Sequence, residues 1–433
     1  MECRYKDSGI EWIGRIPLDW KTTAIKQLMH LYAGATPKSD NEELWDGDIA
    51  WITPADYKTE DVFVSRGRRN ISIKGMESCA TTLLPANSIV FSKRAPIGLV
   101  VLNSEPLCTN QGCIGCIPKK ENANSKYYYY AMSAFTEQFE LYGAGTTFKE
   151  ISANNFGNFL LPFPLIEEQK RIAEYLDGKC SEIDGLIALQ EQMIAQLTDY
   201  KQSVITEAVT KGLNSNVQLV PSGVDWIGKI PEGWKVTVLR RFANIILGKM
   251  LQPNAKLKDD TLEQYICAKD VHFEGIDISD LKKMFFNNTE KKMYQVQKGD
   301  MLVVEGGAGA AGSCVLKNDL PDTYIQNSIM IVRPKQGIDI RYIQYFEFSL
   351  VKKGYVDYVC NKATIPHFTK DKLSTMPIPL PSLEEQQAIA SYLDDKCSEI
   401  DNLIEVKHQK IEKLKDYKKS VIYEAVTGKT IIA

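Results

Sequence analysis

The sequence predicts an α+β protein in which two strand-rich domains are separated by two long antiparallel helices, with an internal repeat that relates the two halves. The first observation is an internal repeat: residues 8–17 (SGIEWIGRIP) recur with few changes as residues 222–231 (SGVDWIGKIP). The second is that short aromatic and β-branched runs, broken by Gly, Pro, Asn and Asp, fill the stretch after each block, as strands and turns do. The third is that each copy ends in a proline-free amphipathic segment, which is typical of a long helix.

The repeat also sets the domain boundaries. One internal helix is expected in each strand-rich domain, near residues 127–141 and 341–351. A Pro-x-Pro hinge follows each domain, and a helix begins only after it because proline disfavours helical geometry in the residue before it. The expected segments are a first strand-rich domain over 1–160, a helical spacer over 161–213, a second strand-rich domain over 214–376 and a C-terminal helical spacer over 377–433.

The two spacers resemble each other far more than the two domains do. Residues 177–210 and 394–427 are identical at 22 of 34 aligned positions, whereas the domain sequences barely agree. A helix that covered only its own divergent domain would diverge with it. The helices are therefore expected to serve each other or a shared partner. The alternative is a pair of ordinary amphipathic helices, each covering its own domain.

Heptad positions counted from Ile183 give each spacer an apolar stripe of moderate quality at positions a, d and e. Lys407 and Lys410 interrupt the stripe in the second copy. The residues expected to pack the helices together are Ile183, Leu186, Ile187, Ile194, Leu197, Tyr200 and Val204, with Ile400, Leu403, Ile404, Ile411, Leu414, Tyr417 and Val421 in the second copy.

The length of the paired helices predicts how far apart the two domains are. A helix over residues 180–210 would be roughly 46 Å long. Two such helices packed antiparallel are expected to hold the domains at opposite ends of a rod, with the N- and C-termini close together. Paired DNA readers address half-sites about 34–36 Å apart or multiples of that distance. The pattern favours a two-armed reader of a split target.

Composition describes an ordinary globular protein. The chain has 433 residues, of which 44% are hydrophobic and 25% charged, and it has no run of about 20 apolar residues that would predict a membrane helix. Ten scattered cysteines and a polar N-terminus indicate reduced thiols and a cytoplasmic protein. The net charge of −3 means that nucleic acid would have to bind through local basic patches.

Motifs for catalysis or metal binding are not supported. Gly223-x4-Gly228-Lys229 resembles a phosphate-binding loop, but Ile230 stands where a Mg²⁺-binding Ser or Thr is required. Cys113-x-x-Cys116 has the spacing of half a zinc site or a redox pair. In the second copy the same slots hold aliphatic residues, which favours buried strand cysteines. The four histidines share no spacing typical of a metal site or triad, so we expect no catalytic residue and no metal in this chain.

Polar and basic stretches occur at matched places in both domains. Lys and Arg side chains neutralise phosphates, while Arg, Gln and Asn bind base edges through paired hydrogen bonds. The candidate DNA-binding residues are Thr36, Lys38, Arg66, Arg68, Arg69, Lys93, Arg94, Thr147 and Lys149 in the first domain, and Lys249, Gln252, Lys256, Lys258, Lys282, Lys283 and Lys362 in the second. Any one of them taken alone is more simply a solvated surface residue.

The chain resembles the specificity (S) subunits of type I restriction–modification systems over nearly its whole length. The likeness rests on the doubled SG-[IV]-[ED]-WIG-[RK]-IP-x2-WK opening, the Pro-x-Pro-x2-EEQ hinge, the KCSEID start of each long helix and the DYK-x-SVI-x-EAVT ending. It implies two target recognition domains, each reading one half of a bipartite asymmetric double-stranded DNA site. It also implies two helices that dock methyltransferase (M) subunits, with translocase–nuclease (R) subunits in the full complex.

The resemblance implies a non-catalytic subunit of an adenine-specific methyltransferase and restriction endonuclease complex. S-adenosylmethionine, ATP and Mg²⁺ would then be bound by the partners and not by this chain. There are two alternatives. The basic loops argue against a repeat scaffold or decoy that binds only proteins, and the length and the absent catalytic motifs argue against a single-chain restriction–modification enzyme. The bases recognised, the length of the gap between them and the presence of an R partner do not follow from the sequence.

Overall fold

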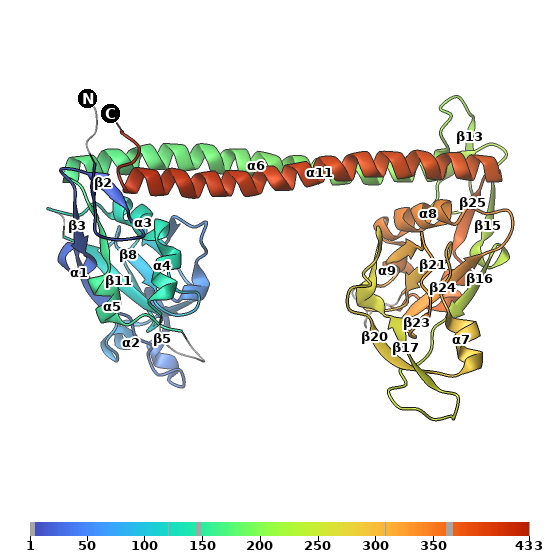
Figure 1. Cartoon of the computed structure of the whole chain (residues 1–433), viewed down its shortest axis with the longest axis horizontal. Helices are drawn as coiled ribbons and strands as arrows, with labels where there is room; N and C mark the ends of the chain where they lie inside the picture. Colours follow the sequence, from blue (N-terminus) through green and yellow to red (C-terminus); the bar gives the residue numbers. More distant parts are fainter. Residues whose placement is uncertain (1–4, 120, 144–148, 308, 361–366, 433) are drawn as a thin grey trace. The chain divides into compact units, whose positions relative to one another are not determined.

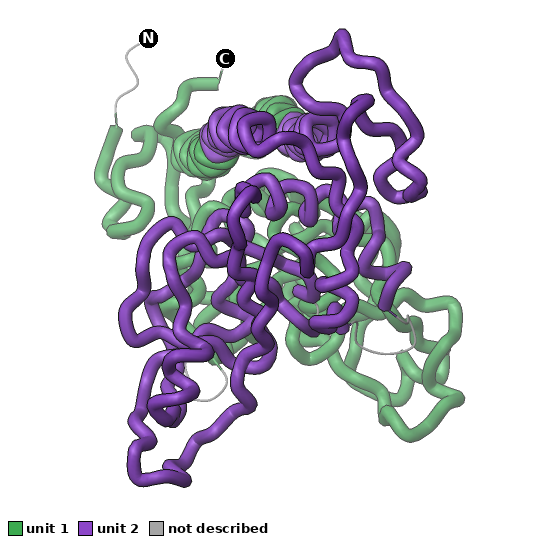
Figure 2. Tube along the Cα trace, turned by 90° about the vertical axis from the view of Figure 1, so that its right-hand side faces the viewer, with its two compact units in different colours: residues 1–190, 408–433 green, residues 191–407 purple. Residues whose placement is uncertain are grey.

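The structure, a computed structural model, describes residues 5–119, 121–143, 149–307, 309–360 and 367–432. The chain forms two compact units, unit 1 (Met1–Gln190 and His408–Ala433) and unit 2 (Glu191–Lys407), which Figure 2 shows in different colours. Each unit combines one strand-rich domain with segments of the two long helices, α6 (Ile166–Lys211) and α11 (Leu383–Val426). Each long helix is thus divided between the two units, and α6 begins at Ile166, after the Pro-x-Pro hinge.

Unit 1 contains a five-stranded sheet of order β4-β11-β8-β9-β6 and a three-stranded sheet of order β10-β5-β7 (Figure 1). Neighbouring strands are antiparallel, except that β6 runs parallel to β9 and β10 runs parallel to β5. Two small antiparallel pairs, β1-β2 and β12-β3, lie beside these sheets. The strands are β1 (Tyr5–Asp7), β2 (Arg15–Pro17), β3 (Lys21–Ala24), β4 (Met29–Ala33), β5 (Trp45–Ile52), β6 (Phe63–Val64), β7 (Arg69–Ile71), β8 (Ile89–Ser92), β9 (Val100–Asn103), β10 (Leu107–Thr109), β11 (Cys113–Pro118) and β12 (Leu160–Phe163).

The helix predicted near residues 127–141 is present in unit 1 as two consecutive helices, α3 and α4. The break falls at Phe135, whose φ of −115° and ψ of 24° are not helical. Asn124 begins α3, because its side chain accepts a hydrogen bond from the backbone of Tyr127. The short helices of the unit are α1 (Ile25–Leu28), η1 (Glu42–Leu44), η2 (Pro54–Asp56), α2 (Ile73–Glu77), α3 (Ser125–Ala134), α4 (Thr136–Leu141) and α5 (Ala153–Asn158).

Unit 2 repeats this plan. Its sheets have the orders β16-β24-β21-β22 and β20-β17-β23, with the pairs β13-β14, β15-β25 and β18-β19 beside them. Its strands are β13 (Leu219–Pro221), β14 (Lys229–Pro231), β15 (Lys235–Val238), β16 (Ala243–Leu247), β17 (Thr261–Ile266), β18 (Val271–His272), β19 (Gly275–Ile276), β20 (Lys282–Phe286), β21 (Met301–Val304), β22 (Ser313–Val315), β23 (Thr323–Ile325), β24 (Ile329–Pro334) and β25 (Pro377–Leu380). Its short helices are η3 (Leu239–Arg241), η4 (Ala268–Asp270), α7 (Asn288–Tyr294), α8 (Ile340–Lys352), α9 (Tyr355–Val359) and α10 (Lys370–Ser374).

The main sheet of unit 1 is buried on both faces. Successive residues of a strand point to opposite sides of a sheet. Ile89 and Phe91 of β8 accordingly join the large core beneath the helices, while Val90 joins a second core under the loops. Unit 2 shows the same division in β21, where Val303 joins one core and Leu302 the other. The repeated α+β fold predicted from the sequence is confirmed.

The Cys113-x-x-Cys116 pair lies on β11, and both thiols are fully buried. Burial raises the pKa of Cys113 to about 12 and also raises that of Cys116, so both thiols stay protonated at neutral pH. The interpretation of these residues as buried strand cysteines is confirmed.

Within each unit a segment of α6 runs antiparallel to a segment of α11 (Figure 1). In unit 1 the Nζ of Lys418 lies 2.7 Å from a carboxylate oxygen of Asp184. In unit 2 the Nζ of Lys201 lies 2.7 Å from a carboxylate oxygen of Asp401. In the repeat, Asp184 is equivalent to Asp401 and Lys201 is equivalent to Lys418. The same ion pair therefore occurs in both units, with the aspartate on α6 in unit 1 and on α11 in unit 2.

Side-chain burial revises the predicted packing set. The side chains at a and e positions are buried or half-buried, and their alternating four- and three-residue spacing is that of a helix seam. This group contains Ile183, Ile187, Ile194, Leu197, Val204, Ile400, Ile404, Ile411, Leu414 and Val421. Four predicted residues at d positions, Leu186, Tyr200, Leu403 and Tyr417, are between 42% and 56% exposed, so the buried seam is formed mainly by the a and e positions.

The repeated Glu-Glu-Gln block fastens each long helix to its own domain. The indole Nε1 of Trp20 donates to Glu168 at 3.0 Å, and that of Trp234 donates to Glu385 at 3.1 Å. These bonds explain why the WK and EEQ blocks recur together, since each pair joins the start of a domain to the start of the helix that follows it.

Each domain is also fastened to the end of the other long helix. The buried hydroxyl of Tyr127 donates to Val426 O of α11 at 3.0 Å, and that of Tyr342 donates to Val209 O of α6 at 3.1 Å. Every long helix therefore serves both units, which accounts for the close match between the helices despite divergent domains. Helices that each cover only their own domain are excluded.

The two ends of the chain meet in unit 1. The hydroxyl of Tyr5 donates to Gly428 O at 3.1 Å. This confirms that the first and last described segments of the chain lie close together, as predicted.

A circular permutant tests this closure. We expect that a chain whose residues 432 and 5 are joined by a short linker, and which opens in the exposed stretch 213–216, melts within about 5 °C of the native chain. The measurement is thermal unfolding followed by circular dichroism. A matched control that opens within β21, where all four residues are buried, should fail to fold. If the first permutant also fails to fold, the termini do not close the repeat.

Candidate nucleic-acid and partner interfaces

Backbone hydrogen bonds gather several loops at one end of the unit 1 strands. Ala35 N donates to Thr109 O at 2.9 Å, and Lys93 N donates to Gly112 O at 2.9 Å. Ile151 N in turn donates to Lys93 O at 3.0 Å. The resulting surface is called loop face 1, and it comprises residues 34–38, 53–56, 93–96, 110–112 and 149–151.

Unit 2 brings the equivalent loops together in the same way. Lys249 N donates to Ile325 O at 3.1 Å, and Glu305 N donates to Ser328 O at 2.8 Å. Phe368 N in turn donates to Glu305 O at 2.6 Å. This surface is called loop face 2, and it comprises residues 248–252, 267–270, 305–307, 326–328 and 367–368.

One glycine in each unit makes this close approach possible. A Cβ atom at Gly34 would lie 2.1 Å from Asn110 O, and one at Gly248 would lie 2.4 Å from Gln326 O. Both distances are far below contact distance with backbone, so any side chain would push the loop after β4 or β16 away from the loop that follows β10 or β23. The matched glycines therefore build the two faces.

Four amide side chains that the sequence analysis did not select lie on these faces. They are Asn110 and Gln111 on loop face 1 and Gln326 and Asn327 on loop face 2. Gln111 is exposed and bonded to the hydroxyl of Thr36, one of the predicted candidates. Gln326 Nε2 donates to Asn327 Oδ1 at 2.7 Å. The sequence signal was present, since an Asn/Gln pair follows the same strand in both copies.

Lys93 and Arg94 form one charged cluster with Glu150 on loop face 1. Lys93 Nζ lies 2.7 Å from one carboxylate oxygen of Glu150, and Arg94 Nε lies 2.9 Å from the other. The Lys93 bond holds the pKa of Glu150 below its usual range, although partial burial opposes this. The cluster thus carries a net charge of +1 and presents a half-exposed guanidinium.

Loop face 2 carries the reverse arrangement at the same backbone position. Isolated bridges join Arg94 to Glu150 in unit 1 and Gly306 to His367 in unit 2. Beside the second bridge, His367 Nδ1 lies 3.8 Å from a carboxylate oxygen of Glu305. Glu305 stands in the place of Lys93, Gly306 in that of Arg94 and His367 in that of Glu150. Loop face 1 and loop face 2 therefore share a backbone arrangement but differ in charge at this position.

The basic stretch 66–69 packs beside loop face 1. Arg68 Nη2 donates to Ala55 O at 3.3 Å, and its Nε lies 3.7 Å from Asp56. Arg69 lies 4.0 Å from the ring centre of Trp45, and Arg66 is exposed. The three guanidinium groups keep much of their surface in water.

Two predicted residues of unit 2 are occupied inside the protein. Lys249 is 7% exposed, donates to Phe285 O at 2.9 Å and pairs with Glu290. Gln252 is 9% exposed and its Nε2 donates to Asp260 at 2.9 Å. We leave both out of the proposed interface, because each side chain is almost fully buried as well as bonded inside the protein.

The remaining candidates differ in where they lie. Thr147 and Lys362 lie outside the described residues. Those with exposed side chains are Thr36, Lys38, Lys149, Lys256, Lys258, Lys282 and Lys283.

A second surface lies on the long helices, where large apolar side chains face solvent at repeat-matched positions. Leu186 and Leu403 are 42% and 46% exposed, and Tyr200 and Tyr417 are 55% and 56% exposed. Leu189 and Val406 form a third matched pair of exposed residues. We call these three pairs the docking residues. Groups of large apolar side chains left in water are common at interaction surfaces.

No helix within the described ranges has the length and apolar character needed to cross a membrane. Among the same residues, His, Cys, Asp and Glu side chains do not gather in any group of three or more that could hold a metal ion.

The chain is thus a doubled α+β protein in which shared long helices are joined to two domains that end in polar loop faces. The family model of the type I restriction modification DNA specificity domain matches residues 17–199 and 231–416. The chain belongs to this family and is the specificity subunit of a type I restriction–modification system.

Individual relatives agree with this assignment. The MjaIX specificity subunit of Methanocaldococcus jannaschii is 30% identical over 323 residues, which cover 70% of each chain. The MjaVIII specificity subunit of the same organism is 24% identical and covers 96% of this chain and 94% of its own. Among solved structures, a chain from a study of type I R-M complex assembly has a TM-score of 0.74 at 16% identity, over 96% of this chain and 99% of its own. The HsdS subunit from Thermoanaerobacter tengcongensis has a TM-score of 0.54 at 16% identity and covers 96% of this chain and 98% of its own.

Proposed function

We propose that this chain reads an asymmetric double-stranded DNA sequence in two parts, one with each loop face, and presents its docking residues to two copies of a methyltransferase subunit. A translocase–nuclease subunit would join them to complete a restriction complex. S-adenosylmethionine, ATP and Mg²⁺ would be bound by those partners.

The observation that carries the DNA proposal is the charge reversal between the two loop faces. The two faces are built on equivalent strands and on an equivalent glycine contact. Both would therefore present the same backbone arrangement to a duplex. Loop face 1 offers Lys93 and Arg94, which bind phosphate or guanine, whereas loop face 2 offers Glu305, whose carboxylate accepts hydrogen bonds from cytosine. The flanking amides suit adenine. Two such faces favour two different half-sites.

The matched docking residues support the partner proposal. The two helices differ at many exposed positions. Leucine nevertheless recurs at exposed positions 186 and 403, and tyrosine recurs at exposed positions 200 and 417. Since the same exposed residue recurs in each unit, one kind of partner would find two similar surfaces.

The Lys93→Ala/Arg94→Ala double variant tests loop face 1. We expect weaker binding at the first half-site and a reduction of about 1 to 2 in the slope of log affinity against log salt, because at most two phosphate contacts are lost. Glu150→Gln should act in the opposite direction, since it releases both cations from their internal partner. Fluorescence anisotropy with duplexes mutated in either half-site measures both effects.

The control is Lys282→Ala/Lys283→Ala in unit 2, which should weaken the second half-site and leave the first unchanged. Equal losses at both half-sites from the unit 1 variant would show that Lys93 and Arg94 act only through the overall charge.

A further inference from the structure

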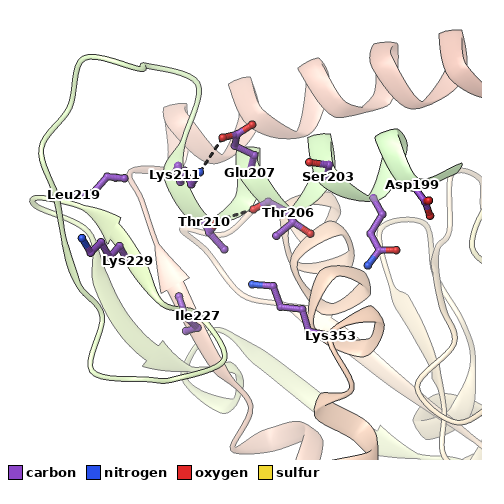
Figure 3. Close-up of a pocket in the computed structure, with 11 residues that line it drawn as sticks. Asp199, Ser203, Thr206, Glu207, Thr210, Lys211, Leu219, Ile227, Lys229 and Lys353 are labelled. Atoms are coloured by element: carbon purple, nitrogen blue, oxygen red, sulfur yellow. Dashed lines mark hydrogen bonds and ion pairs between the residues drawn. The ribbon is translucent and has the colours of Figure 1, made fainter. Parts of the chain in front are cut away.

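Unit 2 contains an open cavity of about 830 Å³ beside its long-helix segment (Figure 3). The last turns of α6 form one wall, the β13-β14 hairpin forms another, and the end of α8 closes the base. The lining includes the hydroxyls of Thr206 and Thr210, the apolar side chains of Leu219 and Ile227, and the amine of Lys353.

Unit 1 fills the corresponding place with a side chain of its own. The hydroxyl of Tyr423 on α11 donates to Trp12 O at 3.1 Å and lies 3.2 Å from Ile13 O, in the turn of the first WIG block. Its ring packs against the edge of Phe135, with ring centres 6.1 Å apart. The amine of Lys429 covers the ring at 4.1 Å from its centre. A phenol is therefore the group that this site in the repeated framework holds in unit 1.

A single substitution in the repeat leaves the place empty in unit 2. Residues 203–210 and 420–427 are identical except that Thr206 stands where the second copy has Tyr423. The hydroxyl of Thr206 accepts a bond from Ser349 at 2.9 Å and does not extend to the WIG turn as the phenol does. Leu219 takes the place of Tyr5, so the hairpin side has also lost an aromatic ring.

The carbonyl that Tyr423 binds in unit 1 has a different donor in unit 2. Lys353 Nζ donates to Trp226 O at 3.2 Å, and Trp226 is the repeat equivalent of Trp12. Desolvation of this amine lowers its pKa, although the residue as a whole is exposed. Within the described residues, Ile227 O receives no hydrogen bond, although its counterpart Ile13 O lies beside the phenol.

We propose that this cavity receives a tyrosine side chain of the methyltransferase subunit that docks on unit 2. The framework holds a phenol in unit 1, and unit 2 keeps the carbonyls, the apolar walls and the space but lacks the ring. The cavity also continues the docking residues, because Ser203 and Glu207 in its lining lie three and seven residues after the exposed Tyr200 and so share its face of α6. This inference rests on the proposed function, since it requires a protein partner on the long helices.

The two copies of the methyltransferase subunit are therefore expected to bind the chain with different affinities. Unit 1 is closed by Tyr423, so only the copy on unit 2 gains the buried ring, and the first methyltransferase subunit binds to unit 2. A buried aromatic anchor at an interface commonly accounts for a difference in affinity on the order of 30-fold.

Thr206→Tyr tests the cavity by restoring the residue of the other copy. The full-length protein is titrated with its methyltransferase subunit by isothermal calorimetry, with stoichiometry checked by native mass spectrometry. The unmodified chain should bind two copies with distinct affinities. Thr206→Tyr should weaken the tighter site by on the order of 30-fold, so that the two affinities become alike.

Thr206→Ala is the matched control, because it loses the same bond to Ser349 but leaves the cavity open, and it should keep the tight site. Leu219→Tyr fills the cavity from the hairpin side and should weaken the same site, which preserves the test if Thr206→Tyr fails to fold. Two unchanged affinities in the filled variants, or an equal loss in Thr206→Ala, would overturn the inference. Failure of the unmodified chain to bind two copies would instead contradict the proposed function.

Discussion

Removal of residues 190–196 together with residues 407–413 is expected to yield a protein that still reads both half-sites but with a gap shorter by roughly three base pairs. Seven residues of helix span about 10 Å, which corresponds to three steps of duplex at about 3.4 Å each. The deletions are equivalent in the repeat and lie at the two points in the sequence where one unit passes into the other. They leave Asp184 with Lys418 in unit 1 and Lys201 with Asp401 in unit 2.

The helix seam should survive this double deletion because seven residues restore the heptad register with only about 20° of rotation. The measurement is sequencing of methylated adenines in a host that expresses the variant with its methyltransferase partner. The control removes residues 190–196 alone, which shifts one helix against the other and should abolish folding or binding. A gap that stays unchanged in the double deletion would contradict the role of the helices as a spacer.

Glu347→Gln is expected to stabilise the protein by on the order of 3 kcal/mol near neutral pH. Glu347 lies on α8, is 1% exposed and takes one hydrogen bond from Ser313 at 2.6 Å. Its other carboxylate oxygen has no hydrogen-bond partner among the described residues. Burial raises the pKa of this carboxyl to about 8, so ionisation is unfavourable in the folded chain.

The pH dependence follows from that direction. Below the ordinary carboxyl pKa of 4.5 the group is protonated in the folded and unfolded states, and no stability is lost. Between pH 4.5 and about 8 the unfolded chain releases the proton while the folded chain retains it, so stability falls as pH rises. The glutamine variant lacks this loss, and the gain should therefore grow from pH 5 to pH 8.

Urea unfolding at several pH values measures the gain. Glutamine keeps the acceptor for Ser313 and differs little in shape, so a change in packing does not confuse the result. Glu232→Gln, at an exposed position, is the control and should show no gain that grows with pH. A gain of equal size at pH 5 and pH 8 would mean that ionisation of Glu347 is not the cause.

The architecture could be predicted from the sequence because the internal repeat allowed each residue to be compared with its equivalent in the other copy. Cys113 and Cys116 could be assigned to a buried strand since the second copy has aliphatic residues there. The helix seam was read less well, because Tyr200 and Tyr417 fall at d positions of a heptad that also has aliphatic residues at e. Only three-dimensional burial shows that the a and e positions pack and the tyrosines face solvent.

Part of the candidate interface depended on contacts that no local pattern shows. Lys249 stands in a basic stretch after a matched glycine, but Glu290 and Phe285, which are distant in sequence, bury its amine. Glu150 lies 56 residues after Arg94 and neutralises part of the Lys93 cluster. The cavity of unit 2 was likewise hidden, because the significance of Thr206 becomes evident only when Tyr423 is seen to occupy the equivalent space.

The central claim is that two unlike loop faces on one chain select the two halves of a single DNA sequence. Sequencing of methylated adenines in a host that expresses the unmodified chain with its methyltransferase subunit tests it most directly. The expected result is methylation of one asymmetric sequence in two parts with a fixed gap of unspecified bases. Methylation without sequence preference, or at a continuous site with no gap, would contradict the account.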